Sequence, residues 1–250
     1  MADGGKRIRI ITIQGIPNFG SAFQSMALCR YLTRCGYGDT EVIDYNPSYF
    51  RPHTLRSMAG VALNLRDCRL RDRRYRDFLA ANVPLTSKRF ASLRELEDEE
   101  FDADVFIAGG DQLWNVYHDC GRDDAYKLTF ARGKKISYGT SLGQSGFTDE
   151  QLSYLAEKIG DFSAVSVRES TSVGMLASKG IAAKHVADPV FLLDQCDYED
   201  LLVDPDDGRY LLVYMVTPSK LLEDCIERLA KRHGLKVVLC FGLSKKCTCD

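Results

Sequence analysis

The sequence lacks the features that define several large classes of protein. Its N-terminal apolar run covers only a few residues, which is too short for a signal peptide or a membrane span. The formal net charge is -2, so no excess charge favours nucleic acid or an anionic membrane as the main partner. The nine cysteines are scattered, odd in number and without the spacing of a disulfide framework. We therefore expect reduced thiols in a cytoplasmic protein.

Two common phosphate-binding loops and a metal site are also missing. Gly15 and Gly20 do not have the spacing of the dinucleotide fingerprint, and no Walker loop occurs. Cys247 and Cys249 provide two thiols, which are too few for a metal site. Residues 102–104 match the Asp-x-Asp pattern of metal-dependent sugar transferases, but they precede a predicted strand. We expect them at the amino edge of the sheet, away from the ligand crevice, and predict neither a metal nor a cofactor.

The chain instead alternates between strand and helix patterns. Hydrophobic residues make up 45% and charged residues 27%, as is typical of a globular protein. The first strand, helix and strand are predicted over residues 7–14, 22–34 and 41–45. Further strands are predicted over residues 105–108, 134–142, 164–167, 184–186, 210–216 and 236–241. This alternation predicts an α/β fold with a parallel sheet and right-handed crossovers.

The predicted helices differ in how clearly the sequence marks them. Thr148 begins a capping box for a helix that reaches residue 159, and Ser170 is the predicted N-cap of the next one. Thr217 followed by Pro218 predicts the start of a helix over residues 219–233. Residues 66–78 form a mixed-charge helix with a basic excess, which is either a solvated helix or a patch for RNA or anionic lipid.

The stretch 104–115 holds the main candidate site. Its apolar run predicts a buried strand that ends at Gly109 and Gly110, and Asp111, Gln112 and Trp114 follow directly. Ligands of open α/β sheets bind at the carboxyl ends of the strands, so these side chains are candidate ligand-binding groups. The alternative is that Trp114 packs beneath a loop and that Asp111 caps a turn.

Other predicted strands also end in polar groups. Arg168 follows a strand and precedes a helix, where a guanidinium can hold a carboxylate or a phosphate. The alternative is a structural arginine that pairs with Glu169 or another carboxylate. The strand over residues 134–142 ends near Ser141, and the loop over residues 15–21 precedes a helix N-terminus that is suited to an anion or a sugar hydroxyl.

Five segments in the same order resemble the polysaccharide pyruvyl transferase family. The family has an Asn-Phe-Gly-Ser/Asn loop, a Gly-Ser-Asp-Gln-x-Trp motif, and segments of the types Ser-Tyr-Ala-x-Ser-x-Gly, Ser-Val-Arg-Glu and Asp-Pro-x-x-Leu-Leu. The matching residues here are 18–21, 109–114, 137–143, 166–169 and 188–193. Gly110 replaces the usual serine and Gly139 the usual alanine.

The resemblance implies a GT-B-like architecture with two facing Rossmann-like domains. We expect an N-terminal Rossmann-like domain with a parallel sheet over residues 1–194, a linker over residues 195–209 and the start of a second, incomplete Rossmann-like domain over residues 210–250. The family's second domain carries a Ser-Phe-His-Gly motif. None of the four histidines has that context: His53, His118, His185 and His233. We therefore expect the chain to be a fragment or a truncated form.

The resemblance also implies an activity, which is transfer of a pyruvyl unit from phosphoenolpyruvate to sugar hydroxyls to form a ketal in a surface polysaccharide. The implied partners are phosphoenolpyruvate and a glycan or lipid-linked sugar; association with a membrane surface and the oligomeric state stay open. Asp111 and Arg168 are the implied catalytic residues. The implied substrate-binding residues are Asn18, Gly20, Ser21, Gly110, Gln112, Trp114, Ser141, Arg168 and Glu169.

Two other functions remain open at this point. One is a GT-B glycosyltransferase that uses a nucleotide sugar in the same cleft, although no nucleotide-binding motif is apparent. The other is a truncated, inactive binding module, which the absent histidine motif favours.

Overall fold

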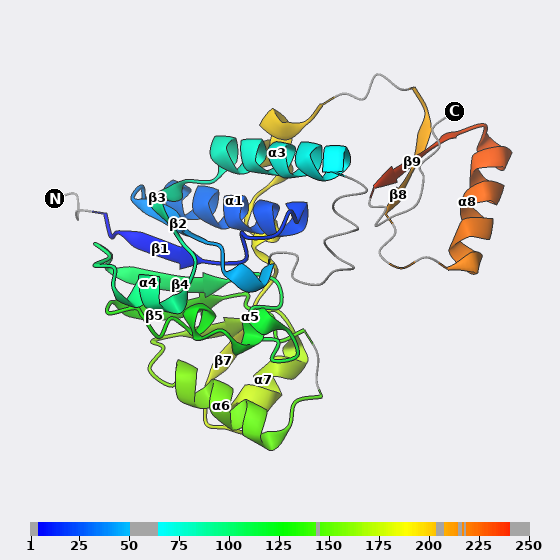
Figure 1. Cartoon of the computed structure of the whole chain (residues 1–250). Helices are drawn as coiled ribbons and strands as arrows, with labels where there is room; N and C mark the ends of the chain where they lie inside the picture. Colours follow the sequence, from blue (N-terminus) through cyan, green and yellow to red (C-terminus); the bar gives the residue numbers. More distant parts are fainter. Residues whose placement is uncertain are drawn as a thin grey trace. The chain divides into compact units, whose positions relative to one another are not determined.

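The structure is a computed structural model that describes residues 5–50, 65–143, 146–203, 208–214, 217 and 219–240 (Figure 1). The chain forms two compact units, Met1–Asp197 and Tyr198–Asp250. Within the described residues, no helix combines the length and the apolar character that a membrane span requires.

The first unit is built on a parallel sheet of five strands in the order β3-β2-β1-β4-β5. The strands are β1 (Ile8–Ile11), β2 (Thr40–Tyr45), β3 (Leu85–Phe90), β4 (Val105–Gly109) and β5 (Lys134–Tyr138). β1 lies between β2 and β4, with Ile8 opposite both Thr40 and Val105. Every residue of β4 is buried, as expected for a central strand covered on both faces. The predicted α/β fold with a parallel sheet is confirmed.

A shorter parallel pair, β6 (Val165–Val167) and β7 (Ala183–His185), continues this sheet beyond β5. Isolated parallel bridges join Ile136 to Ala164 and Thr140 to Val167. Between them, the Oγ of Ser137 donates to the carbonyl of Ser166 at 3.0 Å, and the Oγ of Ser166 donates to the carbonyl of Ser137 at 2.8 Å. The two hydroxyls thus supply hydrogen bonds where the backbone ladder is interrupted.

The strand order reverses direction between β1 and β4. β2 and β3 lie on one side of β1, whereas β4 and β5 lie on the other. In doubly wound α/β folds, the two loops at such a switch point separate and leave a crevice at the carboxyl edge of the sheet. The fold therefore places the loops after β1 and β4 on either side of a natural ligand site.

Helix α1 (Phe19–Arg34) leads from that edge back along the sheet. It begins three residues before the predicted start because the Oδ1 of Asn18 caps it, accepting from the amide of Ser21 at 3.3 Å. Helix α3 (Leu65–Asn82) lies beside α1 (Figure 1), and the ring of Phe19 packs edge-on against that of Tyr75 at 5.7 Å. The predicted helix over residues 66–78 is confirmed and extends further.

The remaining helices of the first unit are short. They are α4 (Leu93–Glu97), α5 (Asp119–Arg122), α6 (Asp149–Ile159) and α7 (Ser170–Ala177), with 3₁₀ helices η1 (Ser48–Phe50), η2 (Asp124–Lys127) and η3 (Pro189–Leu192). A further 3₁₀ helix, η4 (Gln195–Leu201), contains the boundary between the two units. The capping box at Thr148 is confirmed. The predicted N-cap at Ser170 is wrong, because Glu169 takes that place without a side-chain capping bond. Strand β5 ends at Tyr138, short of residue 142, since Gly139 turns the chain with φ of +56°.

The second unit contains one strand-helix-strand motif. β8 (Tyr210–Tyr214) pairs in parallel with β9 (Lys236–Cys240), and α8 (Lys220–His233) connects them. Gly234 caps the C-terminus of α8 with a left-handed φ of +58°. The predicted N-cap at Thr217 is wrong, because the Oγ of Ser219 accepts from the amide of Leu222 at 3.2 Å. Strand β8 is largely open, since Leu212 and Tyr214 are 54% and 66% exposed.

Candidate functional site

A cavity of about 300 Å³ lies at the carboxyl edge of the sheet, at the switch point between β1 and β4. Its walls come from the loops after these two strands, the start of α1, η1 and the start of α5. The lining residues are Ile13, Ile16, Asn18, Ser21, Tyr49, Phe50, Asp111, Gln112, His118, Asp119 and Cys120. Four of the predicted site residues, Asn18, Ser21, Asp111 and Gln112, therefore share one cavity.

Two glycines let β4 turn into this cavity. A Cβ at Gly109 would lie 2.9 Å from the carbonyl oxygen of Tyr138. Gly110 has φ of +130°, and a Cβ there would lie 2.5 Å from the Oγ1 of Thr12. Gln112 continues the turn with φ of +51°. These positive φ angles redirect the chain so that Asp111 and Gln112 reach the cavity wall.

Arg168 lies next to Asp111 in a cluster of four charged side chains. Its Nη2 is 2.6 Å from the Oδ1 of Asp111, and its Nη1 is 3.0 Å from the Oδ2 of Asp188. Its Nε is 3.4 Å from the Oε1 of Glu169. Partial burial lowers the pKa of Arg168, but the hydrogen bonds to Asp111 and Asp188 outweigh this and raise it overall.

These contacts define what Arg168 can do in this conformation. Each of its guanidinium nitrogens is paired with a carboxylate, so an anionic ligand would compete with these carboxylates for Arg168. In this conformation, Arg168 is paired with neighbouring carboxylates, as the alternative interpretation predicts. Asp111, in turn, is held at the cavity wall by a side chain that is 27% exposed.

Glu169 and Ser141 brace the loops behind this cluster. The Oγ of Ser141 donates to the Oε1 of Glu169 at 2.6 Å, and the amide of Leu142 donates to the Oε2 of Glu169 at 3.2 Å. The amide of Ser141 also donates to the carbonyl of Gly110 at 3.2 Å, which ties the loop after β5 to the loop after β4. Ser141 is fully buried and lies outside the cavity lining, so it supports the site from behind.

Trp114, predicted to bind substrate, lies in the core. Its indole is fully buried, and its Nε1 donates to the carbonyl of Tyr126 at 3.0 Å. Its ring packs edge-on against Phe162 with centroids 6.0 Å apart. The indole thus packs beneath a loop, as the alternative interpretation of Trp114 predicts, and none of its surface is open to a ligand.

The N-terminus of α1 forms the opposite wall. Asn18 uses its Oδ1 to cap the helix, and Ser21 is 3% exposed. A Cβ at Gly20 would lie 3.1 Å from the Oδ1 of Asn18, so the cap leaves little room for a side chain there. The free amides of the first helical turn and the helix dipole favour a partial negative charge at this wall.

Three further residues, His118, Asp119 and Cys120, line the cavity although no sequence pattern predicts them there. His118 is the N-cap residue of α5, and all three line the same cavity as Asp111. Burial raises the pKa of the Cys120 thiol to about 11, so this sulfur is protonated at neutral pH and is a poor nucleophile. The short sequence separation of His118 from Asp111 was the only indication in the sequence that His118 belongs to this site.

A buried polar network supports this wall. The hydroxyls of Tyr45 and Tyr49 donate to the Oδ2 of Asp123 at 2.6 and 2.7 Å. Lys127 is fully buried, and its Nζ donates to the carbonyls of Gly121 and Asp123 at 2.9 and 3.1 Å. Burial lowers the pKa of Lys127 and raises that of Tyr49. The network fixes the segment that carries His118 and Cys120.

The Asp-x-Asp pattern lies at the other edge of the sheet. Asp102 and Asp104 both pair with Arg7, and the Oδ2 of Asp104 accepts from the backbone amide of Arg7 at 2.8 Å. The predicted position at the amino edge is confirmed. Within the described residues, no group of three or more His, Cys, Asp or Glu side chains is arranged to hold a metal ion.

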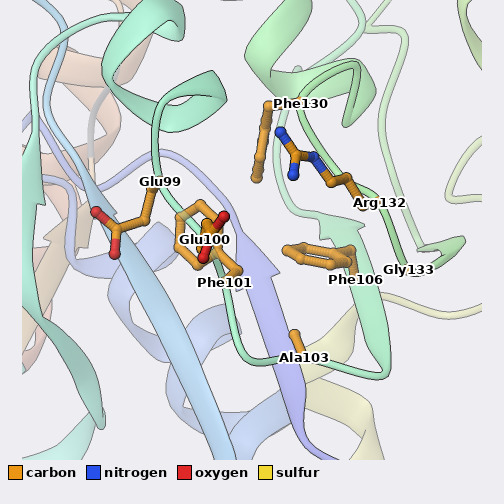
Figure 2. Close-up of a pocket in the computed structure, with 8 residues that line it drawn as sticks. All are labelled: Glu99, Glu100, Phe101, Ala103, Phe106, Phe130, Arg132 and Gly133. Carbon is orange, nitrogen blue, oxygen red and sulfur yellow. The ribbon is translucent and has the colours of Figure 1, made fainter.

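A second cavity, of about 210 Å³, also lies at the amino edge (Figure 2). The rings of Phe101, Phe106 and Phe130 stand around it, with centroids 5.5 to 5.8 Å apart, and Arg132 lies above. These rings belong to the main hydrophobic core. The cavity is an opening into that core and contains none of the predicted site residues.

Comparison with known proteins adds one result to this geometry. A family model described as polysaccharide pyruvyl transferase matches residues 18–244. The match begins at Asn18, the residue that caps α1, and includes the turn after β4 and the Arg168 cluster. A comparison with curated protein sequences finds no match.

Proposed function

Because the chain belongs to the polysaccharide pyruvyl transferase family, we propose that it transfers the pyruvyl unit of phosphoenolpyruvate to a sugar acceptor. The product is a pyruvate ketal on a surface or exopolysaccharide precursor, made in the cytoplasm. The observation that carries this proposal is the cavity in which Asp111 and Gln112 face Asn18 and the start of α1.

The proposed reaction balances without a cofactor. One acceptor oxygen bonds to C2 of phosphoenolpyruvate, and C3 takes up a proton to become a methyl group. A second acceptor oxygen then bonds to C2 as phosphate leaves. The two acceptor hydroxyls release two protons. The methyl group at C3 accounts for one of them, and the hydrogen phosphate product carries the other. The site must therefore remove protons from hydroxyls and deliver one to carbon.

Cavity residues suit these tasks. Asp111 acts as the base for an acceptor hydroxyl, while Gln112 and Asn18 orient the sugar through their amide groups. His118 is the nearby group for proton delivery, because imidazole is the side chain that commonly exchanges protons near neutral pH. These roles require the side chains to reach the same substrate, and they line the same cavity.

Donor binding in this proposal requires one exchange of partners at Arg168. A carboxylate or phosphate of phosphoenolpyruvate replaces Asp111 on the guanidinium, which keeps the positive charge paired. The exchange also releases Asp111 to accept a proton from the sugar. Donor binding and activation of the base would then be one event.

The proposed architecture is GT-B-like, with residues 1–194 as a Rossmann-like domain that binds the acceptor, residues 195–209 as a linker and residues 210–250 as part of a second Rossmann-like domain. This arrangement is supported by the strand order of the first unit and the parallel strand-helix-strand motif of the second. A nucleotide-sugar glycosyltransferase and an inactive binding module remain as outcomes of the following test.

The test combines ligand binding with turnover. The 250-residue chain is first screened by thermal shift against phosphoenolpyruvate and nucleotide sugars. It is then incubated with phosphoenolpyruvate and a panel of acceptor glycans, and phosphate release is compared with the appearance of a ketal methyl signal by NMR. Acceptor-dependent formation of both products supports the proposal. Stabilisation by nucleotide sugars alone would assign a glycosyltransferase, and sugar binding without donor binding would assign a binding module.

A further inference from the structure

A third and larger cavity, of about 680 Å³, adjoins the candidate site. It shares Ile16 and Phe50 with the smaller cavity, so the two spaces have a common wall. We call it the arginine groove. Its lining residues are Gln14, Gly15, Ile16, Pro17, Asp44, Asn46, Phe50, Cys68, Arg71, Asp72, Tyr75, Arg76, Leu79, Ala80, Leu85 and Arg89.

One face of α3 forms a side of the arginine groove. The lining positions from Cys68 to Ala80 recur at intervals of three and four, which is the spacing of a single helical face. Arg71 and Arg76 lie on this face, whereas Arg73 pairs with Asp77 elsewhere on the helix. Some of the arginines that give α3 its basic excess therefore line a cavity, so the helix is not simply a solvated one.

The lining of the arginine groove has more arginines than carboxylates. The Nε of Arg89 is 2.8 Å from the Oδ2 of Asp44, and Arg71 lies 3.5 Å from Asp72. Arg76 has no ion-pair partner among the residues that the structure describes, and its side chain is exposed. One positive charge is therefore available to a ligand in the groove.

The rest of the lining suits a hydroxylated ligand. Asn46 has an amide group that both donates and accepts hydrogen bonds, Phe50 provides aromatic surface, and both side chains are partly exposed. A volume of this order accommodates a ligand well beyond the reacting atoms. A polar ligand that extends from the candidate site past Ile16 and Phe50 would reach Arg76.

We propose that the arginine groove binds a second unit of the sugar acceptor and that Arg76 holds an anionic group on that unit. The inference rests on the proposed function for the position of the reacting unit. It names the substrate class as an acidic acceptor of at least two sugars. The anionic group is either a carboxylate or a phosphate ester, since a guanidinium binds both.

The test measures binding to the full 250-residue chain by NMR titration. The probes are cellobiose, cellobiouronic acid with a carboxylate on one sugar, and a cellobiose phosphate ester. We expect the wild type to bind at least one acidic probe about tenfold more tightly than cellobiose, and to lose this preference as salt screens the charge. The stronger of the two acidic probes identifies the anionic group.

Substitutions at two arginines of α3 locate the effect. Arg76→Met is expected to bring the acidic probes to the affinity of cellobiose, whereas Arg73→Met, on the same helix, keeps the preference. Equal binding of all three probes by the wild type, no binding of any probe, or a preference that survives in Arg76→Met overturns the proposal. If the Arg76-dependent preference holds but phosphoenolpyruvate is neither bound nor consumed, the groove stands and the proposed transferase activity fails.

Discussion

Arginine–carboxylate clusters lie at both edges of the same sheet, but they differ in exposure and surroundings. At the amino edge, Arg7 pairs with Asp102 and Asp104, whose side chains are 77% and 43% exposed. At the carboxyl edge, Arg168 pairs with Asp111, Asp188 and Glu169, none more than 36% exposed.

The difference shows that composition alone does not identify a site. Both clusters join one arginine to more than one carboxylate, yet only the second contributes a carboxylate, Asp111, to the lining of the cavity at the switch point between β1 and β4. The Asp-x-Asp pattern of the first resembles a transferase motif in sequence but tethers β1 to the segment before β4. Position relative to the strand ends separates an exposed tether from a candidate catalytic group.

Asp111→Asn is expected to give the largest difference between the two edges. Loss of the base should lower kcat/KM for pyruvyl transfer by about 10²–10⁴-fold, because asparagine keeps the shape but cannot accept the proton. Asp102→Asn at the amino edge serves as the control and should keep full activity. Equal losses in both variants, measured by phosphate release, would remove the distinction between the edges.

Arg168→Ala should affect both stability and activity. It leaves Asp111, Asp188 and Glu169 without their shared cation, so the free energy of unfolding should fall by about 1–3 kcal/mol, less than for a fully buried pair. Activity should fall by about 10²-fold or more through misplacement of Asp111 and loss of donor binding.

The matched variant at the other edge is Arg7→Ala, for which we expect unchanged activity and little change in the denaturation midpoint. Chemical denaturation and binding of phosphoenolpyruvate are measured on both variants. Unchanged donor binding in Arg168→Ala would leave Arg168 with a positioning role alone.

His118→Asn tests a residue that only the structure placed in the site. If His118 delivers the proton, kcat should fall by up to about 10²-fold, and one limb of the pH profile of kcat/KM should be lost. His233→Asn, on an exposed helix of the second unit, is the control. An unchanged pH profile would limit His118 to shaping the cavity.

Asp104→Asn should produce the smallest effect, and one that depends on pH. Hydrogen bonds from Arg7 hold the pKa of Asp104 below its usual value. The carboxylate therefore contributes stability above its unfolded pKa of about 4, and this contribution is lost as the pH falls through the lower folded pKa. The difference in denaturation midpoint between wild type and variant should be present at pH 7 and vanish in strong acid. A constant difference at all pH values would show that the charge is not its source.

The sequence predicted most strands because they are apolar and sharply bounded, as β4 is by its two glycines. It did not reveal β3, whose residues Leu85–Phe90 are mostly polar and exposed along one edge of the sheet. An edge strand needs fewer apolar residues, so its pattern resembles that of a loop. The start of α1 was misplaced for a related reason, because the capping bond of Asn18 depends on a turn that periodicity does not show.

The position of a side chain at the carboxyl edge could be predicted where it depends on one strand and its loop, but not where distant segments meet. Asp111 and Gln112 could be predicted from the strand that precedes them. The joining of Arg168 to Asp111, 57 positions away, and to Asp188, 20 positions away, depends on the order of the strands. The burial of Trp114 could not be predicted from the sequence either, because the turn at Gln112 determines which side chains face the core.

The close approach of Gly110 to Thr12 has a consequence for how this site can evolve. The related family motif carries serine where this chain has Gly110, but a Cβ there would lie 2.5 Å from the Oγ1 of Thr12 at φ of +130°. Serine at position 110 therefore requires a residue smaller than threonine at position 12 or another path for the turn, whereas Thr12 can be replaced by a smaller residue while position 110 is glycine. Substitutions at the two positions are thus ordered: a side chain at position 110 becomes accessible only after Thr12 has been lost or the turn has changed.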